Sequence, residues 1–327
     1  MKQNSLWGRL ALLAAAMIWG SSFFILKDAL ADMPVFLLLA VRFTAGFGVL
    51  ALIFRRRLLR MGRAAALHGV VCGVLLFVAY AFQTFGLQET TPGKNAFLTT
   101  VYCVLVPFME MAFAWGRELF DRRLSVQPGA DGPIAVFRGR DTRHAAIPTR
   151  WNWLAAVACL IGIGLVSLNE SLTMNRGDAL TLICGVFYAL HVLAVGHYTR
   201  DEDAVGLTIV QFGAAALCNW ALSLLTEQMP VSIPTDALAE LVYLALFPTA
   251  IAMLLQNVGQ SVTPAAPAAI LLSLESVFGV LFSVIFAGEQ VTARLLCGFT
   301  LIFLAVIASE THFSFLFPHR KDGSPWT

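Results

Sequence analysis

The sequence predicts an all-α membrane protein with ten transmembrane helices, arranged as two inverted five-helix repeats around a central cavity. Three observations lead to this class. First, 58% of the residues are hydrophobic and only 13% are charged, whereas soluble domains have roughly a quarter of their residues charged. Second, the hydrophobic residues stand in long runs joined by short polar links. Third, the two halves of the chain match each other weakly.

Ten runs are long enough to be transmembrane helices. A helix that crosses a hydrocarbon core about 30 Å thick needs about 20 mostly apolar residues. The first run follows a basic N-terminus but lacks a small-residue cleavage pattern, so we expect it to be a retained helix rather than a signal peptide. The predicted spans are residues 10–30, 35–54, 64–87, 96–115, 153–168, 179–196, 205–225, 238–257, 267–287 and 293–309.

Basic residues are concentrated in every second link between the predicted spans, and this pattern indicates the orientation of the chain in the membrane. Residues 55–63 contain five arginines and residues 116–150 contain seven, whereas the links between them have few basic residues. The cytoplasmic links of membrane proteins carry the excess of Lys and Arg. We therefore expect a multi-pass protein of the cell's inner (plasma) membrane with both termini in the cytoplasm.

The two halves of the chain correspond span by span. With a shift of 169 residues Trp19 falls on Tyr188, and with a shift of 173 residues Gln83 falls on Gln256. The last spans match at a shift of 140, so the first half is about 33 residues longer, and the excess lies after Trp115. Because five is odd, the halves must cross the membrane in opposite senses. Many secondary transporters have this arrangement, with the substrate site near mid-membrane.

The expected domains follow from this correspondence. Residues 1–170 form the first repeat, with a cytoplasmic insertion at about 118–150. Residues 171–310 form the second repeat, and residues 311–327 form a cytoplasmic tail. The insertion is rich in Pro, Gly and Arg. It is predicted to be a passive loop, and contact with anionic lipid head groups is the alternative.

Enzyme and cofactor motifs are missing from the sequence. All six cysteines fall inside apolar runs, and none forms a CxxC pair or a Cys/His metal spacing. The Gly93-Lys94 pair lacks the glycine spacing and the following Ser or Thr of a phosphate-binding loop. There is no HExxH and no GxSxG motif. We expect no disulfide, no metal, no cofactor, no nucleic-acid partner and no enzymatic activity.

Short motifs in both halves resemble the EamA-type drug/metabolite transporter superfamily. They lie at residues 19–24, 41–43, 90–98, 177–180, 188–191, 247–250, 272–275 and 287–289. The resemblance implies a ten-helix fold, a cavity lined mainly by spans one, three, four, six, eight and nine, and export of amino acids or related metabolites. The chain differs from the family pattern at Tyr188, where Trp is frequent, and at Ser276, where Pro is frequent.

Two charged residues inside predicted spans are candidates for transport. Arg42 lies mid-span, where a charge costs at least about 2.5 kcal/mol on insertion scales, so it must face protein or water. It would attract a substrate carboxylate, or else form a structural pair with a carbonyl or acidic group. Glu275 favours its protonated form in a low-dielectric medium, which suits a proton-coupled cycle. A helix-packing hydrogen bond or a pair with Arg42 is the alternative for Glu275.

Further polar and aromatic residues are predicted to line the cavity. His191 would shuttle a proton or simply bond to a neighbouring helix. Small hydroxyl groups suit helix packing as well as substrate contact, whereas Trp and Tyr offer flat amphipathic surfaces. Lys94 and Asn95 lie where a helix N-terminus would favour an anion, unless the segment is an ordinary turn. The complete predicted set is Trp19, Ser21, Ser22, Phe23, Arg42, Gln83, Lys94, Asn95, Tyr102, Tyr188, His191, Gln256 and Glu275.

The sequence therefore predicts a secondary transporter that exports a small polar metabolite, such as an amino acid, by alternating access. Its partners would be the solute, the lipid bilayer and a coupling proton. A multidrug or nucleotide-related metabolite permease is the first alternative. A membrane enzyme or sensor on the same scaffold is the second, and it would need a catalytic cluster that the sequence does not contain.

Overall fold

The computed structural model describes residues 2–124, 148–168, 173–199, 201–230, 232–263 and 265–311. Most of the predicted insertion at about 118–150 and nearly all of the predicted tail at 311–327 lie outside these residues. The described chain is almost entirely helical. Its elements in order are α1 Lys2–Asp32, α2 Val35–Ile53, α3 Arg55–Leu59, α4 Arg63–Glu89, α5 Pro92–Thr99, α6 Tyr102–Leu124, α7 Arg150–Ser167, α8 Arg176–Tyr198, α9 Ala204–Thr226, α10 Thr235–Leu244, the π-helix η3 Ala245–Ile251, α11 Ala252–Val262, α12 Ala265–Phe286 and α13 Ala293–Thr311.

The helical membrane class is confirmed. Within the described residues, eight helical segments are long and apolar enough to cross a membrane. Two shorter apolar stretches, Leu271–Phe286 and Ala293–Ser309, stand where the ninth and tenth spans are predicted. The count of ten spans stays a prediction.

Large apolar side chains are exposed around the outside of the bundle. Leu52, Leu160, Leu217 and Leu225 are each more than 60% exposed. A soluble monomer rarely exposes apolar surface on this scale. The outer surface is therefore suited to lipid tails.

Two of the predicted spans contain a break in the α-helix. The fourth begins at Pro92, four residues before its predicted start, and is divided into α5 and α6 near Val101. Proline is favoured in the first turn of a helix because its missing N–H needs no partner there. Successive β-branched residues, Thr99 to Val101, weaken the helix at the division. The eighth span passes from α10 through η3 into α11 around Pro248.

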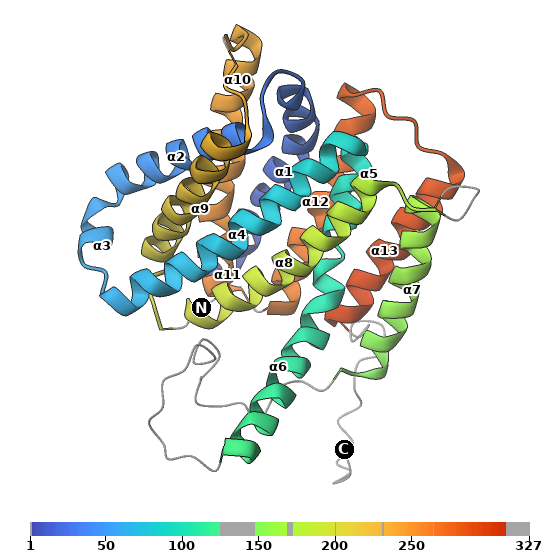
Figure 1. The fold of residues 1–327 in the computed structure, drawn as a ribbon. Helices are drawn as coiled ribbons and strands as arrows, with labels where there is room; N and C mark the ends of the chain where they lie inside the picture. Colours follow the sequence, from blue (N-terminus) through green and yellow to red (C-terminus); the bar gives the residue numbers. More distant parts are fainter. Residues whose placement is uncertain are drawn as a thin grey trace.

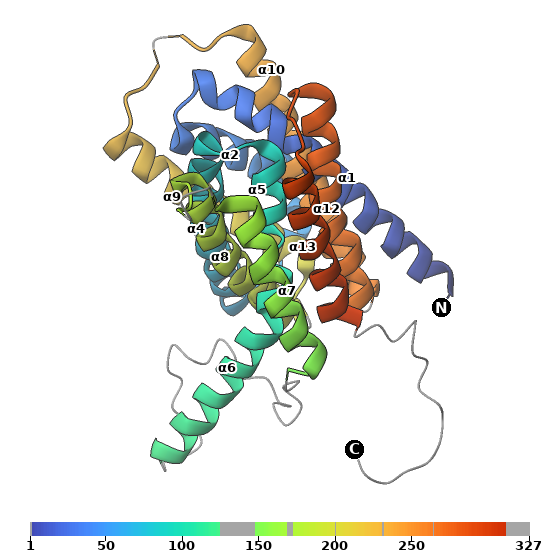
Figure 2. The ribbon, with the colours of Figure 1, turned by 90° about the vertical axis from the view of Figure 1, so that its right-hand side faces the viewer.

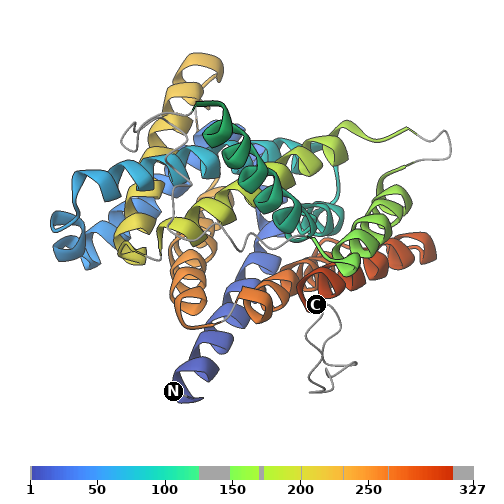
Figure 3. The same cartoon turned by 90° about the horizontal axis from the view of Figure 1, so that it is seen from below.

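The helices pack as a bundle in which distant parts of the chain lie side by side. The helix α1 packs on α11 and α12, and α8 packs on α4, α5 and α6. The helix α2 packs on α9, and α7 packs on α13, as Figures 1 and 2 show. Figure 3, seen from below, shows that the α7 and α13 pair lies at one side of the bundle. Contacts between the two halves therefore dominate the core.

Two glycine pairs bring helices from different halves into close contact. A Cβ atom added to Gly86 of α4 would lie 2.8 Å from the carbonyl oxygen of Gly177 at the start of α8. A Cβ atom added to Gly259 of α11 would lie 3.0 Å from the carbonyl oxygen of Gly8 in α1. The shift of 169 relates Gly8 to Gly177, and the shift of 173 relates Gly86 to Gly259. Small residues permit such close backbone packing inside membranes.

We expect the Gly86→Ala substitution to destabilise the protein. The new Cβ would meet the backbone of Gly177 and the hydroxyl of Thr181 at 2.5 Å, and overpacking of this kind costs about 1 to 3 kcal/mol. Gly48→Ala is the matched control because its Cβ meets nothing within 4 Å, so it should gain up to about 1 kcal/mol from helix propensity. Thermal unfolding in detergent measures both. Equal melting temperatures for the two variants would contradict the packing described.

Candidate functional site

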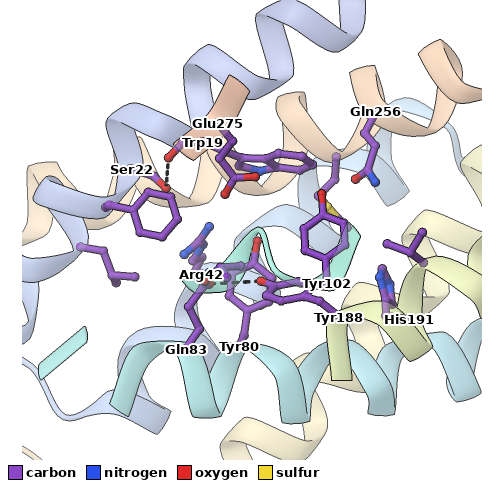
Figure 4. A pocket seen from close by; sticks show the side chains of 15 residues that line it. Trp19, Ser22, Arg42, Tyr80, Gln83, Tyr102, Tyr188, His191, Gln256 and Glu275 are labelled. Atoms are coloured by element: carbon purple, nitrogen blue, oxygen red, sulfur yellow. Dashed lines mark hydrogen bonds between the residues drawn. The ribbon is translucent and has the colours of Figure 1, made fainter. Parts of the chain in front are cut away.

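A cavity with about 590 Å³ of atom-free space, including its open part, lies among α1, α2, α4, α5, α6, α8, α11 and α12. Both halves of the chain contribute side chains to it (Figure 4). The lining residues are Trp19, Ser22, Phe23, Leu26, Arg42, Tyr80, Gln83, Thr99, Tyr102, Tyr188, His191, Val192, Met253, Gln256 and Glu275.

Most of the residues predicted from the sequence line this cavity. The ten that do so are Trp19, Ser22, Phe23, Arg42, Gln83, Tyr102, Tyr188, His191, Gln256 and Glu275. Ser21, Lys94 and Asn95 are not among the lining residues. The structure thus brings together predicted residues from seven separate helices, while the role of each in transport stays a prediction.

The three other predicted residues make contacts outside the cavity lining. Ser21 faces α10, where its hydroxyl lies 2.6 Å from the hydroxyl of Tyr243. The Lys94 ammonium lies 3.8 Å from the carboxylate of buried Asp178. Asn95 is buried and donates to the Thr181 hydroxyl at 2.7 Å. These side chains connect neighbouring helices.

Arg42 is held at the cavity wall by two different contacts. Its side chain is buried, and its Nε–H donates to the hydroxyl of Thr249 in η3. Its guanidinium carbon lies 4.9 Å from the ring centre of Tyr80, a cation–π distance. Among the described residues no carboxylate pairs with Arg42 within 4 Å. The positive charge is therefore positioned without being neutralised by the protein.

Glu275 enters the same cavity from α12 (Figure 4). Within the described part of the chain its carboxylate makes no hydrogen bond or ion pair, so the predicted alternative of a pair with Arg42 does not occur in this conformation. One acidic and one basic group thus face a shared space without being joined to each other. Such a pair is suited to a solute, or a proton, with complementary charge.

A hydrogen-bonded group from both halves forms another part of the wall. The Gln83 side chain donates to the Thr99 hydroxyl and accepts from the Tyr188 hydroxyl, each at 3.1 Å. The Tyr188 ring contacts the ring of Tyr80 edge-on at 5.6 Å and that of Tyr102 at 6.2 Å. The wall therefore combines amphipathic aromatic surface with fixed polar groups, as small-molecule sites do.

His191 bonds to a neighbouring helix while it faces the cavity. Its Nε2 lies 3.0 Å from the side-chain oxygen of Gln211 in α9, and the residue is buried. This contact agrees with the structural alternative stated for His191. It leaves the proton-shuttle role as a prediction.

Sequence reasoning missed Leu26, Tyr80, Thr99, Val192 and Met253. Helical spacing was an available signal for all five, because each lies three or four residues from a predicted residue. Tyr80 lies three residues before Gln83 and Thr99 lies three residues before Tyr102, so each shares a helix face or a turn with a predicted residue. Met253 lies three residues before Gln256 in the same way, but an apolar residue type alone does not distinguish a cavity position in an apolar span.

A separate polar cluster joins the helices at the end of the bundle where α5 begins. The Lys27 ammonium donates to the carbonyl oxygens of Leu87 and Gln88 at the end of α4, at 2.7 and 2.8 Å. The Glu289 carboxylate accepts from the Gly93 N–H at 2.9 Å and from the Thr91 hydroxyl. The Lys27 contacts lie within the first half, and the Glu289 contacts join the two halves at this end of the bundle. Groups of three or more potential metal ligands do not occur among the described residues.

Comparison with known proteins identifies the family. The EamA-like transporter family matches residues 6–119 and 175–310, which include every residue that lines the cavity. The chain belongs to the EamA-like transporter family. It is a multi-pass membrane transporter, and its partners are therefore a small-molecule solute and the lipid bilayer.

The transporter is similar to individual proteins along nearly its whole length. An uncharacterized transporter of Archaeoglobus fulgidus is 30% identical over 302 residues, which cover 92% of this chain and 85% of that protein. A solved crystal structure aligns with a TM-score of 0.63 and 18% identity, covering 94% of this chain and 98% of that one. At this identity the second likeness shows the fold alone.

Proposed function

We propose that the transporter carries a small polar metabolite with a carboxylate group, such as an amino acid, through the cavity by alternating access. The observation that carries this proposal is the arrangement of Arg42 and Glu275, which face one cavity without pairing with each other. Arginine binds planar oxyanions through two parallel N–H groups. Glu275 would receive a substrate ammonium or a proton, and the aromatic walls would contact the remaining surface of the solute.

We also propose that two repeats, residues 1–170 and 171–310, move against each other around this site. The interhelical contacts support this proposal. For most contacts between a helix of the first half and a helix of the second, the corresponding helices of the opposite halves also pack together. The contact of α1 with α11 corresponds to that of α8 with α4, and the contact of α1 with α12 corresponds to that of α8 with α5 and α6. The Gly8–Gly259 and Gly86–Gly177 pairs follow the same correspondence. Inverted repeats of this kind underlie alternating access in other transporters.

Orientation and direction complete the proposal. The arginines of residues 55–63 lie at the end of the bundle where α1 begins and α13 ends (Figure 1). The excess of positive charge there supports a cytoplasmic location for both termini in the inner membrane. Export is supported by the family resemblance. Glu275 is the proposed site of a coupling proton.

A growth screen tests substrate and direction together. Cells that overproduce the transporter are exposed to toxic amino acids and metabolite analogues and compared with cells that produce the Arg42→Gln variant. Export predicts that the wild type raises the tolerated concentration of at least one carboxylate-bearing compound. Greater sensitivity to such compounds would indicate import, and unchanged sensitivity across the panel would contradict the proposed substrate class.

A further inference from the structure

The break in the eighth span lies beside two cavity residues. Pro248 stands inside the π-helix η3 and has no N–H to donate to the Leu244 carbonyl oxygen. The hydroxyl of Thr249 donates to that oxygen, at 2.8 Å. The same hydroxyl accepts the Nε–H of Arg42, and Thr249 is only 1% exposed. The threonine that follows the proline therefore links the irregular turn to Arg42.

The carbonyl oxygen of Pro248, one turn after that of Leu244, also accepts a hydrogen bond from a side chain. The N–H of Ala252 bonds to Phe247 in the wider turn rather than to Pro248. The Pro248 carbonyl oxygen accepts from the indole N–H of Trp19 at 2.8 Å. One irregular turn therefore holds both the aromatic residue of α1 and the cation of α2 against the cavity.

The Thr249 contact determines which part of the guanidinium is available. A guanidinium has five N–H donors in a planar fork, and Nε carries one of them. Within the described residues Nε is the atom of Arg42 that makes a hydrogen bond, and neither Nη atom makes one. Anchoring through Nε leaves the two Nη atoms for a ligand. A planar carboxylate matches such a fork with two parallel bonds.

We propose that Thr249 is a positioning residue for Arg42. Its hydroxyl, oriented by the Leu244 carbonyl oxygen, fixes the guanidinium through Nε so that the Nη–H groups face the cavity and donate to the substrate carboxylate. This inference rests on the proposed function for its consequence in transport, but the hydrogen bond itself is independent of any substrate.

Three variants separate positioning from general stability. Thr249→Val keeps the shape of the side chain and removes the hydroxyl, whereas Thr249→Ser keeps the hydroxyl. Thr44→Val is the matched control, because the Thr44 hydroxyl also donates to a helix carbonyl oxygen, of Ala40 at 2.7 Å, and accepts a side-chain N–H, from Trp220 at 2.9 Å. Thr44 does not line the cavity. If Thr249→Val fails to fold, Thr249→Ala replaces it.

The first measurement needs no substrate. The purified full chain is labelled with ¹⁵N-arginine, and the Arg42 Nε–H signal is assigned by its loss in Arg42→Lys. We expect this signal to exchange slowly with water in the wild type, in Thr249→Ser and in Thr44→Val, and to exchange rapidly in Thr249→Val. Slow exchange in Thr249→Val, or rapid exchange in the wild type, would overturn the proposal.

The second measurement is uptake into liposomes of each radiolabelled L-amino acid, taken one at a time. Thr249→Val should raise KM by about 10- to 100-fold, the range for a hydrogen bond to a charged group, with a smaller change in maximal rate. Thr249→Ser and Thr44→Val should stay within about threefold of the wild type. An equal KM in Thr249→Val and wild type would overturn the proposal. If the wild type moves none of these solutes, the proposed substrate class fails, and the Nε–H exchange still decides whether Thr249 positions Arg42.

Discussion

Replacing Arg42 by glutamine is expected to lower kcat/KM for a carboxylate-bearing solute by roughly 100-fold or more. Removing one partner of a desolvated, hydrogen-bonded charge pair costs about 2 to 5 kcal/mol. The neutral amide also lacks the two parallel donors that a guanidinium offers. Arg42→Lys should recover part of the activity, because it restores the charge without the fork. Uptake into liposomes measures kcat/KM for the wild type, Arg42→Gln and Arg42→Lys.

Arg57→Gln is the control for this experiment. Arg57 pairs with Asp203 at 2.8 Å in an exposed position near the start of α9, and exposed ion pairs contribute little to stability. We expect its transport to equal that of the wild type. If a folded Arg42→Gln variant transports as well as Arg57→Gln, Arg42 does not bind the substrate.

Replacing Glu275 by glutamine is expected to abolish proton-driven accumulation of the solute. Glutamine keeps the size and most of the hydrogen-bonding capacity of the side chain, but it cannot take up or release a proton. Accumulation against a gradient should fall to the level seen without a pH difference. Exchange of labelled for unlabelled solute should persist, because exchange needs no net proton movement. Uptake and exchange into liposomes across a range of pH values distinguish the two activities.

Glu110→Gln is the corresponding control, since Glu110 is exposed on α6 and does not line the cavity. It should keep both accumulation and its dependence on pH. Accumulation by Glu275→Gln with the pH dependence of the wild type would exclude Glu275 as the coupling site.

The sequence predicted the helical class and most of the cavity because polar residues stand out in apolar spans. Arg42, Gln83 and Glu275 are costly inside a membrane and must therefore face protein or water. Trp19 and Tyr188 were found because the repeat relates them to each other.

Other cavity residues could not be predicted because their direction depends on helix rotation. Leu26 and Met253 would be equally stable against lipid, a neighbouring helix or the cavity, so residue type does not decide among these. Lys94 and Asn95 lie a few residues before the cavity residues Thr99 and Tyr102. Their side chains contact α8 instead, because buried Asp178 and Thr181 face them there. The packing partner, and not the residue itself, sets their role.

The geometry of the eighth span was also beyond sequence reasoning. Pro248 indicates an irregular helix, but it does not indicate a π-helix or the contact of the Thr249 hydroxyl with the Leu244 carbonyl oxygen. The contact between Thr249 and Arg42 joins residues 207 positions apart. It depends on how α2 packs against η3.

The most direct test of the account is thiol modification of Ser22→Cys during transport in liposomes. Ser22 lines the cavity and is 7% exposed, so a small thiol reagent attached there would occupy the proposed path. The unmodified variant should transport at least one carboxylate-bearing solute, that solute should slow the modification, and complete modification should stop transport. The wild type, treated in the same way, should keep its activity, because its exposed Cys297 lies outside the cavity. Undiminished transport by fully modified Ser22→Cys would contradict the assignment of this cavity as the transport path.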